Sequence, residues 1–294
     1  SDDGAHGLTV IAFVGSVFSP YYRRALARDA QASPDEHCAI NVCLYSPGAA
    51  RWTMTERGAR HVERERSTFV VGPSRLRWHG DALEIALDER SVPLARAVRG
   101  VLRLHPHGLS RFAAPLDGLA RHRWGPIAPC ARIEVDLESP ALHWQGHAYF
   151  DSNEGDEPIE RGFTRWDWLR TAAADGSTAV IYDVTPRDTK RGGASRLVTQ
   201  RFAPDGSASA FEASPRQRLG PSAWWRIDRQ VRSAGASARV LRTLEDTPFY
   251  ARSLIELPLA GGERVQAVHE TLDVPRLCSP LVQSLLPFRM PRRA

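Results

Sequence analysis

Lysine is nearly absent from this chain of 294 residues, which carries only Lys190 among its 39 basic side chains. Catalysis through a Schiff base therefore has a single candidate. The net charge of +5 is spread along the chain and forms no basic stripe of the kind that a nucleic-acid groove needs. We therefore expect no nucleic-acid partner.

Cysteine is scarce as well. The four cysteines, Cys38, Cys43, Cys130 and Cys278, show neither C-x-x-C spacing nor the density of a disulfide scaffold. This pattern predicts reduced thiols and a cytosolic compartment. The chain also lacks a basic segment followed by an apolar one, the pattern of a secretory signal.

Long apolar runs and nucleotide-binding motifs are missing. The longest apolar stretch near the N-terminus, 8–18, is shorter than the roughly 20 residues that cross a bilayer. G-x-G-x-x-G, P-loop and G-x-S-x-G patterns do not occur, which argues against nucleotide cofactors and serine hydrolase chemistry.

What the sequence does contain is a series of short β-like segments separated by Gly, Pro, Asp and Ser, the spacing of an antiparallel sandwich or barrel. These segments are 37–46, 51–56, 67–72, 76–87, 98–107, 131–137, 178–185, 195–202, 223–231, 238–244, 251–259 and 264–272. Helical periodicity is limited to 20–30, after Pro20, and to 279–286. The prediction is a mostly β protein with few short helices.

The number of segments predicts two domains. Roughly eight candidate strands precede Asp151 and roughly eight follow it, and one small antiparallel barrel takes about eight strands. We expect two tandem antiparallel barrels, 7–155 and 156–294. No linker marks the boundary, which can lie as late as about residue 205.

The stretch "HAYFDSNEGDEPIERGFTRWDW", 147–168, combines six acidic residues with two tryptophans. If 142–151 is a strand, the polar side chains alternate with apolar ones and share a face. That face carries His143, Gln145, His147, Tyr149 and Asp151. One interpretation is an ordinary solvent-exposed face. The other is the lining of a cavity, because these side chains donate, accept and titrate.

The acidic residues that follow Asp151 favour the interpretation of this face as the lining of a cavity. Asn153, Glu154, Asp156, Glu157 and Glu160 follow Asp151 closely, and crowded carboxylates raise the pKa of at least one member. A carboxyl group that stays protonated at neutral pH is a proton donor.

Aromatic side chains gather in the same part of the chain. His122 and Trp124 would share a face of a strand, as would Trp166 and Trp168. Aromatic faces stabilise cations, although a half-buried tryptophan beside a hydrogen-bonded histidine explains the first pair equally well. Metal binding through His143 and His147, or through His105 and His107, is not expected, because neither pair has the flanking pattern of a zinc site.

Seven separated blocks resemble one family, the acyclic carotenoid 1,2-hydratases or hydroxyneurosporene synthases. The blocks are "GLTVIAFVGSVFSPYYRRA", "HCAINVCLYS", "RWTMTERG", "HRWGPIAP", "HAYFDSNEGDEPIERGFTRWDW", "TLEDTPFYARS" and "LLPFRMPRR". The match runs from about Gly7 to Arg293, nearly the whole chain. A more distant resemblance links it to tocopherol cyclases and fungal pericyclases, which share a tandem lipocalin-like architecture.

The resemblance implies addition of water to the terminal C1=C2 double bond of neurosporene or lycopene, without cofactor or metal. It implies His122, Trp124, Tyr149 and Asp151 as catalytic residues. We expect Trp166, Trp168, His147 and Asn153 to contact the substrate. The resemblance also implies peripheral attachment to the inner membrane of a phototrophic bacterium.

Three alternatives stay open. The first is a prenyl or polyene cyclase or pericyclase on the same scaffold. The second is a noncatalytic carotenoid carrier, although a carrier would have no use for a carboxylic acid in an apolar pocket.

The third concerns the C-terminal segment 277–294. This segment carries apolar residues beside Arg289, Arg292 and Arg293, which suits an anionic bilayer surface. The same segment is also explained by docking onto its own barrel.

Overall fold

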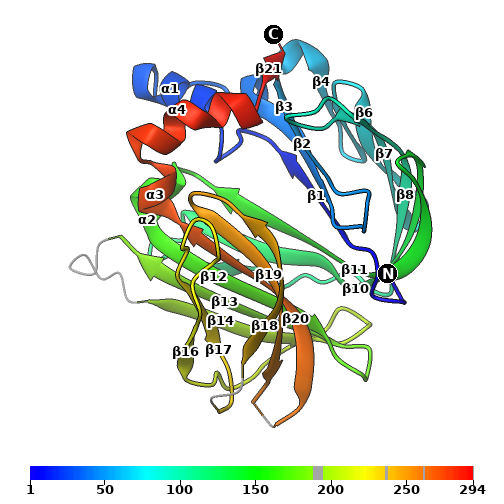
Figure 1. Ribbon diagram of the computed structural model, residues 1–294, viewed down its shortest axis with the longest axis vertical. Helices are drawn as coiled ribbons and strands as arrows, with labels where there is room; N and C mark the ends of the chain where they lie inside the picture. The colour runs from blue at the N-terminus through cyan, green and yellow to red at the C-terminus, as the bar shows by residue number, and fades with distance from the viewer. Residues whose placement is uncertain (188–194, 236–237, 261, 294) are drawn as a thin grey trace. The chain divides into compact units, whose positions relative to one another are not determined.

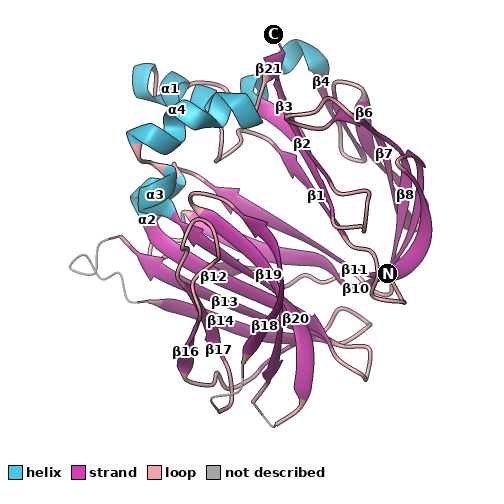
Figure 2. Ribbon diagram, viewed as in Figure 1, coloured by secondary structure: helices cyan, strands magenta, loops and turns pink. Residues whose placement is uncertain are grey.

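The computed structural model describes residues 1–187, 195–235, 238–260 and 262–293, and strands make up most of its regular structure (Figure 2). Within these residues the strand pairings are mainly antiparallel, with one short parallel pair at the C-terminus. The predicted mostly β class is thus confirmed. Lys190 lies outside the described residues. Within them, no helix is both long and apolar enough to span a bilayer.

The chain divides into two compact units that interleave along the sequence. The first unit holds Ser1–Pro106, Arg132–Ala148 and Gln283–Ala294, and the second holds His107–Ala131 and Tyr149–Val282. The expected division at residue 155 separates consecutive halves, whereas these units exchange segments. Two long strands, β10 (His122–Ser139) and β11 (Ala141–Gly155), contribute residues to both units.

The first unit contains a four-stranded sheet in the order β1-β2-β3-β21, with β1 Leu8–Phe13, β2 Cys38–Leu44, β3 Arg51–Arg57 and β21 Arg292–Arg293 (Figure 1). Every residue of β2 is buried. A second sheet has the order β11-β10-β8-β7-β6-β5-β4. Its other strands are β4 Val62–Arg64, β5 Thr68–Val71, β6 Ser74–His79, β7 Ala82–Arg90 and β8 Ala97–Pro106, and β9 Ala114–Pro115 pairs with β10.

The second unit is built on a seven-stranded sheet in the order β15-β14-β13-β12-β20-β19-β18. The strands are β12 Phe163–Ala172, β13 Thr178–Pro186, β14 Arg196–Phe202, β15 Ala208–Ala210, β18 Arg239–Asp246, β19 Tyr250–Pro258 and β20 Arg264–Asp273. One face of this sheet packs with the hairpin β16 (Arg216–Leu219) and β17 (Arg229–Arg232) around Leu169, Ile181 and Ile255. The alternate residues of the same strands form the other face.

Both predicted helices are present. Helix α1 spans Pro20–Arg28, with Pro20 at its start and Ser19 Oγ accepting from the N–H groups of Tyr21 and Tyr22 at 3.1 and 2.9 Å. Helix α4 spans Pro280–Arg289. The remaining short helices are η1 Pro34–His37, η2 Ala59–His61, α2 Ile159–Gly162 and α3 Val274–Leu277.

The prediction of one strand over 223–231 was wrong for most of its length. Only its end belongs to β17, while Trp224 and Trp225 lie in an exposed turn. The Asp246 carboxylate accepts from the Trp224 N–H at 2.8 Å, and Arg226 has a φ of 53°. A positive φ is not a strand conformation, so no strand continues through Arg226.

Candidate active site

Trp124, Tyr149 and Asp151 form one hydrogen-bonded group in the second unit. The Trp124 indole Nε1–H donates to Asp151 Oδ2 at 2.8 Å, and the Tyr149 hydroxyl donates to the same oxygen at 3.0 Å. The two-residue period of β11 places Tyr149 and Asp151 on one face, as predicted. The neighbouring strand β10 supplies Trp124.

Aromatic rings surround this group. Trp124 is 1% exposed, and its ring centroid lies 5.8 Å from that of Tyr182 and 5.9 Å from that of Phe112. The Tyr149 ring lies 5.7 Å from that of Trp168. We call Trp124, Tyr149, Asp151, Trp168 and Tyr182 the Asp151 cluster. Its carboxyl group is therefore enclosed by apolar rings and does not stand in open solvent.

Burial raises the pKa of the Asp151 carboxyl group to about 6. The hydrogen bonds from Trp124 and Tyr149 oppose this rise because they favour the ionised form, and the charge of Glu270 adds to it. The acidic stretch after Asp151 is not the cause, which corrects our expectation. Asp156 accepts two hydrogen bonds from Arg123 at 3.0 Å each, and Glu157 accepts one from Arg121 at 2.8 Å. These carboxylates are neutralised by arginines of the β10 region.

The two oxygens of Asp151 are not equivalent. Oδ2 accepts both hydrogen bonds, whereas Oδ1 accepts none from the residues that the structure describes. Because both donors occupy Oδ2, the proton of the neutral acid belongs on Oδ1. The side chain of Asp151 is only partly buried.

His122 lies beside the cluster but is held by other groups. Its ring is 4.6 Å from that of Phe163, and a Cβ added at Gly155 or Gly162 would come within 2.9 or 3.0 Å of it. Its Nε2 is buried without a hydrogen-bond partner in the described part of the chain, and Glu157 Oε1 lies 4.0 Å away. Burial lowers the pKa of His122, so the ring is neutral and closely packed.

The four residues expected to contact the substrate have different surroundings. Trp168 belongs to the cluster, and Trp166 lies 6.2 Å from the Tyr182 ring. The Tyr182 hydroxyl donates to Asn153 Oδ1 at 3.3 Å, which ties Asn153 to the cluster. His147 is exposed and belongs to the first unit.

Comparison with known proteins assigns the chain to a family. Residues 10–294 match the carotenoid hydratase family CrtC. The chain belongs to this family. The CrtC assignment confirms the resemblance carried by the seven sequence blocks.

Relatives of this CrtC family member agree with the assignment. An acyclic carotenoid 1,2-hydratase of Rubrivivax gelatinosus is 56% identical over 296 residues, covering 100% of this chain and 71% of that protein. One from Thiocapsa roseopersicina is 49% identical, with 99% and 71% covered. One from Cereibacter sphaeroides is 39% identical, with 97% and 98% covered.

A solved structure agrees on the fold. A protein from Nitrosomonas europaea described as AttH superposes with a TM-score of 0.60 at 11% sequence identity, covering 84% of this chain and 83% of its own. At this identity the similarity speaks for the shared β architecture alone. It supports the lipocalin-like class that the sequence predicted.

Three residues near Asp151 were not predicted from the sequence of this CrtC protein. Arg170 places its guanidinium carbon 5.5 Å from the centre of the Tyr149 ring. It continues the period of Trp166 and Trp168 along β12, so its position was readable from "FTRWDWLR". Tyr182 and Glu270 come from β13 and β20, and their approach depends on strand pairing that no local motif reveals.

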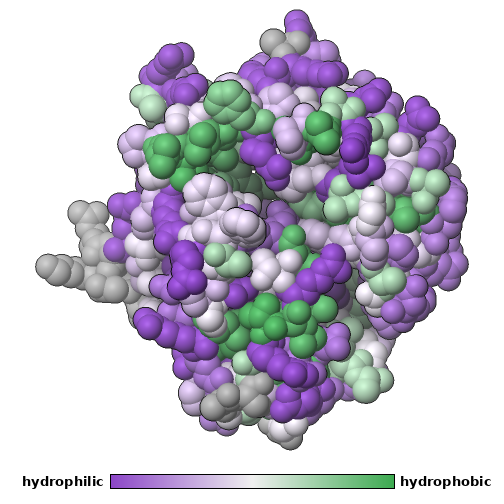
Figure 3. All heavy atoms as spheres, in the orientation of Figure 1, coloured by the Kyte–Doolittle hydropathy of each residue, from purple (hydrophilic) through white to green (hydrophobic). Residues whose placement is uncertain are grey.

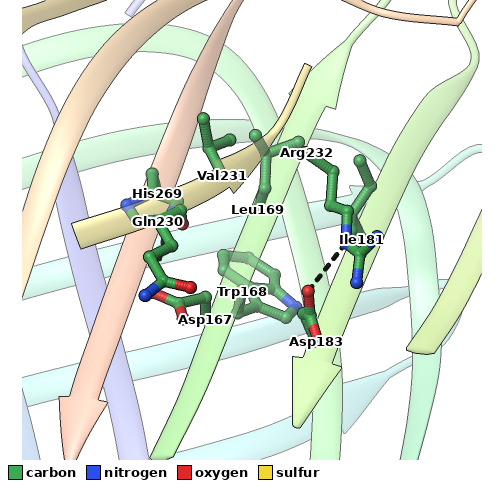
Figure 4. Close-up of a pocket in the computed structure, with 9 residues that line it drawn as sticks. All are labelled: Asp167, Trp168, Leu169, Ile181, Asp183, Gln230, Val231, Arg232 and His269. Carbon is green, nitrogen blue, oxygen red and sulfur yellow. Dashed lines mark hydrogen bonds and ion pairs between the residues drawn. The ribbon is translucent and has the colours of Figure 1, made fainter. Parts of the chain in front are cut away.

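A small cavity lies on the opposite face of the same sheet (Figure 4). There Asp167 accepts from Arg165 at 2.8 and 3.0 Å and from Thr271 at 2.6 Å, and Arg232 donates to Asp183 at 2.8 Å. These contacts provide hydrogen-bond partners for the carboxylates of Asp167 and Asp183 beside β17. The described residues hold no group of three or more His, Cys, Asp or Glu side chains arranged for a metal ion.

Proposed function

We propose that this protein adds water to the terminal C1=C2 double bond of an acyclic carotene such as lycopene or neurosporene, giving the tertiary 1-hydroxy product. The observation that carries the proposal is the Asp151 carboxyl group, held at Oδ2 by Trp124 and Tyr149 within aromatic rings. Membership of CrtC and the names of its relatives support the same reaction. The proposal needs neither a metal nor a nucleotide cofactor.

Asp151 is the acid. An isolated alkene is a weak base, so its protonation requires an aimed acid in a site from which water is excluded. With a pKa of about 6, roughly one tenth of the free protein carries the proton at pH 7. An apolar chain that displaces water from around the carboxylate raises this pKa further, because desolvation disfavours the charged form. Substrate binding therefore favours the reactive acid.

The aromatic rings shelter the cation. Proton transfer from Asp151 to C2 leaves the positive charge on the tertiary carbon C1, which fixes the position of the hydroxyl group. The faces of Trp124 and Tyr149 stabilise that charge electrostatically. Their hydrogen bonds to Oδ2 simultaneously stabilise the carboxylate that remains.

The test uses lycopene in deuterated water without oxygen. We expect the wild-type protein to form 1-hydroxylycopene with deuterium at C2, and Asp151→Asn to lose at least about 100-fold in rate, the contribution typical of a general acid. A folded Asp151→Asn protein that hydrates at the wild-type rate would show that the acid is another group. A product lacking the mass of water would instead support a cyclase.

We further propose that helix α4 contacts the membrane in which the substrate is dissolved. One stripe of the helix, Val282, Leu286 and Met290 just beyond its end, is buried. A second stripe is exposed, with Leu281 at 67%, Leu285 at 41% and Phe288 at 77%. Figure 3 shows hydrophobic side chains gathered over the region of this helix. An exposed apolar stripe on a docked helix suits the surface of a bilayer.

The arginines of this segment have partners within the protein. Arg289 lies 4.2 Å from the Trp52 ring centre and donates to the Val92 carbonyl, and Arg292 is paired with Glu56. The apolar stripe therefore supports the membrane contact better than the basic residues do. We expect Leu285→Glu/Phe288→Glu to abolish flotation with liposomes. Arg293→Gln is the control, and equal flotation of all three proteins would contradict the contact.

A further inference from the structure

The reaction needs a second proton carrier. When water attacks the tertiary cation, it must lose a proton to a base. His122 is a poor choice for this role, because its ring is packed between Gly155 and Gly162 and its Nε2 is buried. The base must therefore be sought among the other groups that face the cluster.

Strand register brings one carboxylate to this face. A single row of paired residues crosses six strands of the sheet, from β18 to β14. In order, it reads Glu245, Arg252, Glu270, Trp168, Tyr182 and Val198. Directly opposed residues of antiparallel strands lie on the same face with their Cβ atoms about 5 Å apart. Glu270 thus neighbours Trp168, whose ring packs on Tyr149.

Arg252 holds Glu270 in place. The buried Arg252 donates through Nε to Glu270 Oε1 at 2.8 Å and through Nη1 to Glu245 Oε1 at 2.6 Å. Within the described chain Glu270 Oε2 accepts no hydrogen bond, and the side chain is only partly buried. One oxygen is therefore anchored while the other remains able to accept a proton.

We propose that Glu270 is the second catalytic carboxylate, which binds the attacking water and takes its proton. This inference rests on the proposed hydration. Asp151 and Glu270 then form an acid and base pair with separate roles, set by their different surroundings. The aromatic side of the site holds the acid, and the ion-paired row holds the base.

Hydration proceeds by proton transfer and then by capture of water. The Asp151 Oδ1–H bond breaks and its proton forms a bond with C2, using the π electrons of the alkene. The water oxygen then forms the C1–O bond, and one water proton moves to Glu270 Oε2. At the end of the turnover Asp151 is ionised and Glu270 is protonated, so the proton returns from Glu270 to Asp151 through water before the next cycle.

The experiment separates protonation from water capture. Wild type, Asp151→Asn, Glu270→Gln and Glu256→Gln are incubated with lycopene in deuterated water, and both product and recovered lycopene are examined for deuterium. Glu256 is the matched control, since it is a glutamate on β19 that also pairs with arginines, Arg239 and Arg264. Melting temperatures verify that each variant is folded.

We expect Glu270→Gln to lower the rate of hydration by about 100-fold or more, the effect typical of losing a general base. Deuterium should still enter recovered lycopene, because Asp151 continues to protonate the alkene and the cation returns without being captured. Asp151→Asn should lose both signals, and Glu256→Gln neither. Hydration by folded Glu270→Gln within threefold of wild type would overturn the role, as would joint loss of hydration and exchange.

Chemical rescue gives an independent answer. Formate added to Glu270→Ala should restore hydration in a saturable manner, whereas a purely structural role predicts no rescue. If neither variant folds, Glu270→Asp keeps the charge beside Arg252 and should hydrate about tenfold more slowly because its carboxylate is withdrawn. An unchanged rate for Glu270→Asp would contradict the proposal. Absence of hydration by the wild type would remove the proposed function itself, and Glu270 with it.

Discussion

The Trp124 indole donates a hydrogen bond of 2.8 Å to Asp151 Oδ2. An indole N–H can only donate, so this contact fixes which oxygen of Asp151 serves as acceptor. The other oxygen is left to carry the proton. The relationship also sets an electrostatic balance, because the hydrogen bond favours the carboxylate while burial favours the acid. That balance and the packing of His122 determine four properties that can be measured.

The first concerns the pH dependence of the reaction. Asp151 must be protonated to act as an acid, and burial raises its pKa to about 6 in the free protein. We expect kcat/KM for lycopene to be nearly constant from pH 5 to about pH 6 and to fall tenfold per pH unit above it. Steady-state rates between pH 5 and 9 measure this profile. A rate that rises from pH 6 to 8 would exclude Asp151 as the proton donor.

The second concerns stability. The pKa of Asp151 is raised above the value of 3.8 for an unperturbed carboxyl group, so the folded state binds the proton more tightly than the unfolded state does. The contribution of Asp151 to stability therefore falls as the pH rises from about 4 to about 6, by up to about 3 kcal/mol. We expect Asp151→Asn, which removes this charge, to be more stable than wild type at pH 8 and nearly equal to it at pH 4.

Urea unfolding at the two pH values measures this difference. Asp183→Asn is the contrasting variant, because Asp183 is buried and ion-paired with Arg216 and Arg232. Removing that carboxylate leaves two arginines without their partner and should destabilise the protein by about 3 kcal/mol at pH 8. If Asp151→Asn were also destabilised at pH 8, the Asp151 carboxylate would stabilise the folded state, and the prediction would be wrong.

The third prediction concerns Arg170. Its positive charge lies near Tyr149 and lowers the pKa of Asp151. Replacing Arg170 with Gln should therefore raise that pKa and move the alkaline limb of the rate profile to higher pH. Arg165→Gln is the matched control on the same strand, because Arg165 faces the opposite side and pairs with Asp167. If the alkaline limb of the rate profile does not shift in Arg170→Gln, the Arg170 guanidinium is too distant or too screened to change the pKa of Asp151.

The fourth concerns the packing around His122. A Cβ at Gly162 would approach the His122 ring to 3.0 Å, so Gly162→Ala should displace the ring by tenths of an ångström. We expect a cost of about 1–3 kcal/mol in stability, as for overpacking elsewhere. Hydration should fall about tenfold if the position of His122 supports the cluster.

Gly220→Ala serves as the control, because nothing lies within 4 Å of the added atom. Thermal unfolding and hydration rates of the two alanine variants give the comparison. Wild-type activity in a destabilised Gly162→Ala protein would restrict His122 to a role in folding.

Local sequence determined much of this protein. Alternation along 142–151 predicted the strand β11 and placed Tyr149 and Asp151 on one face, since successive side chains of a strand point to opposite sides. Pro20 marked the start of α1. The same alternation does not predict whether a side chain is buried, however. His147 shares the period of Asp151 but is exposed.

Tertiary structure decided what surrounds the acid. The acidic residues close to Asp151 in sequence pair with Arg121 and Arg123, while Glu270, far along the chain, contributes the neighbouring negative charge. The register of β12 with β20 brings Glu270 opposite Trp168, and register depends on the whole sheet. The sequence thus determined which residues are able to do the chemistry. Only folding decided which of them share an environment, because solvation and charge act through space.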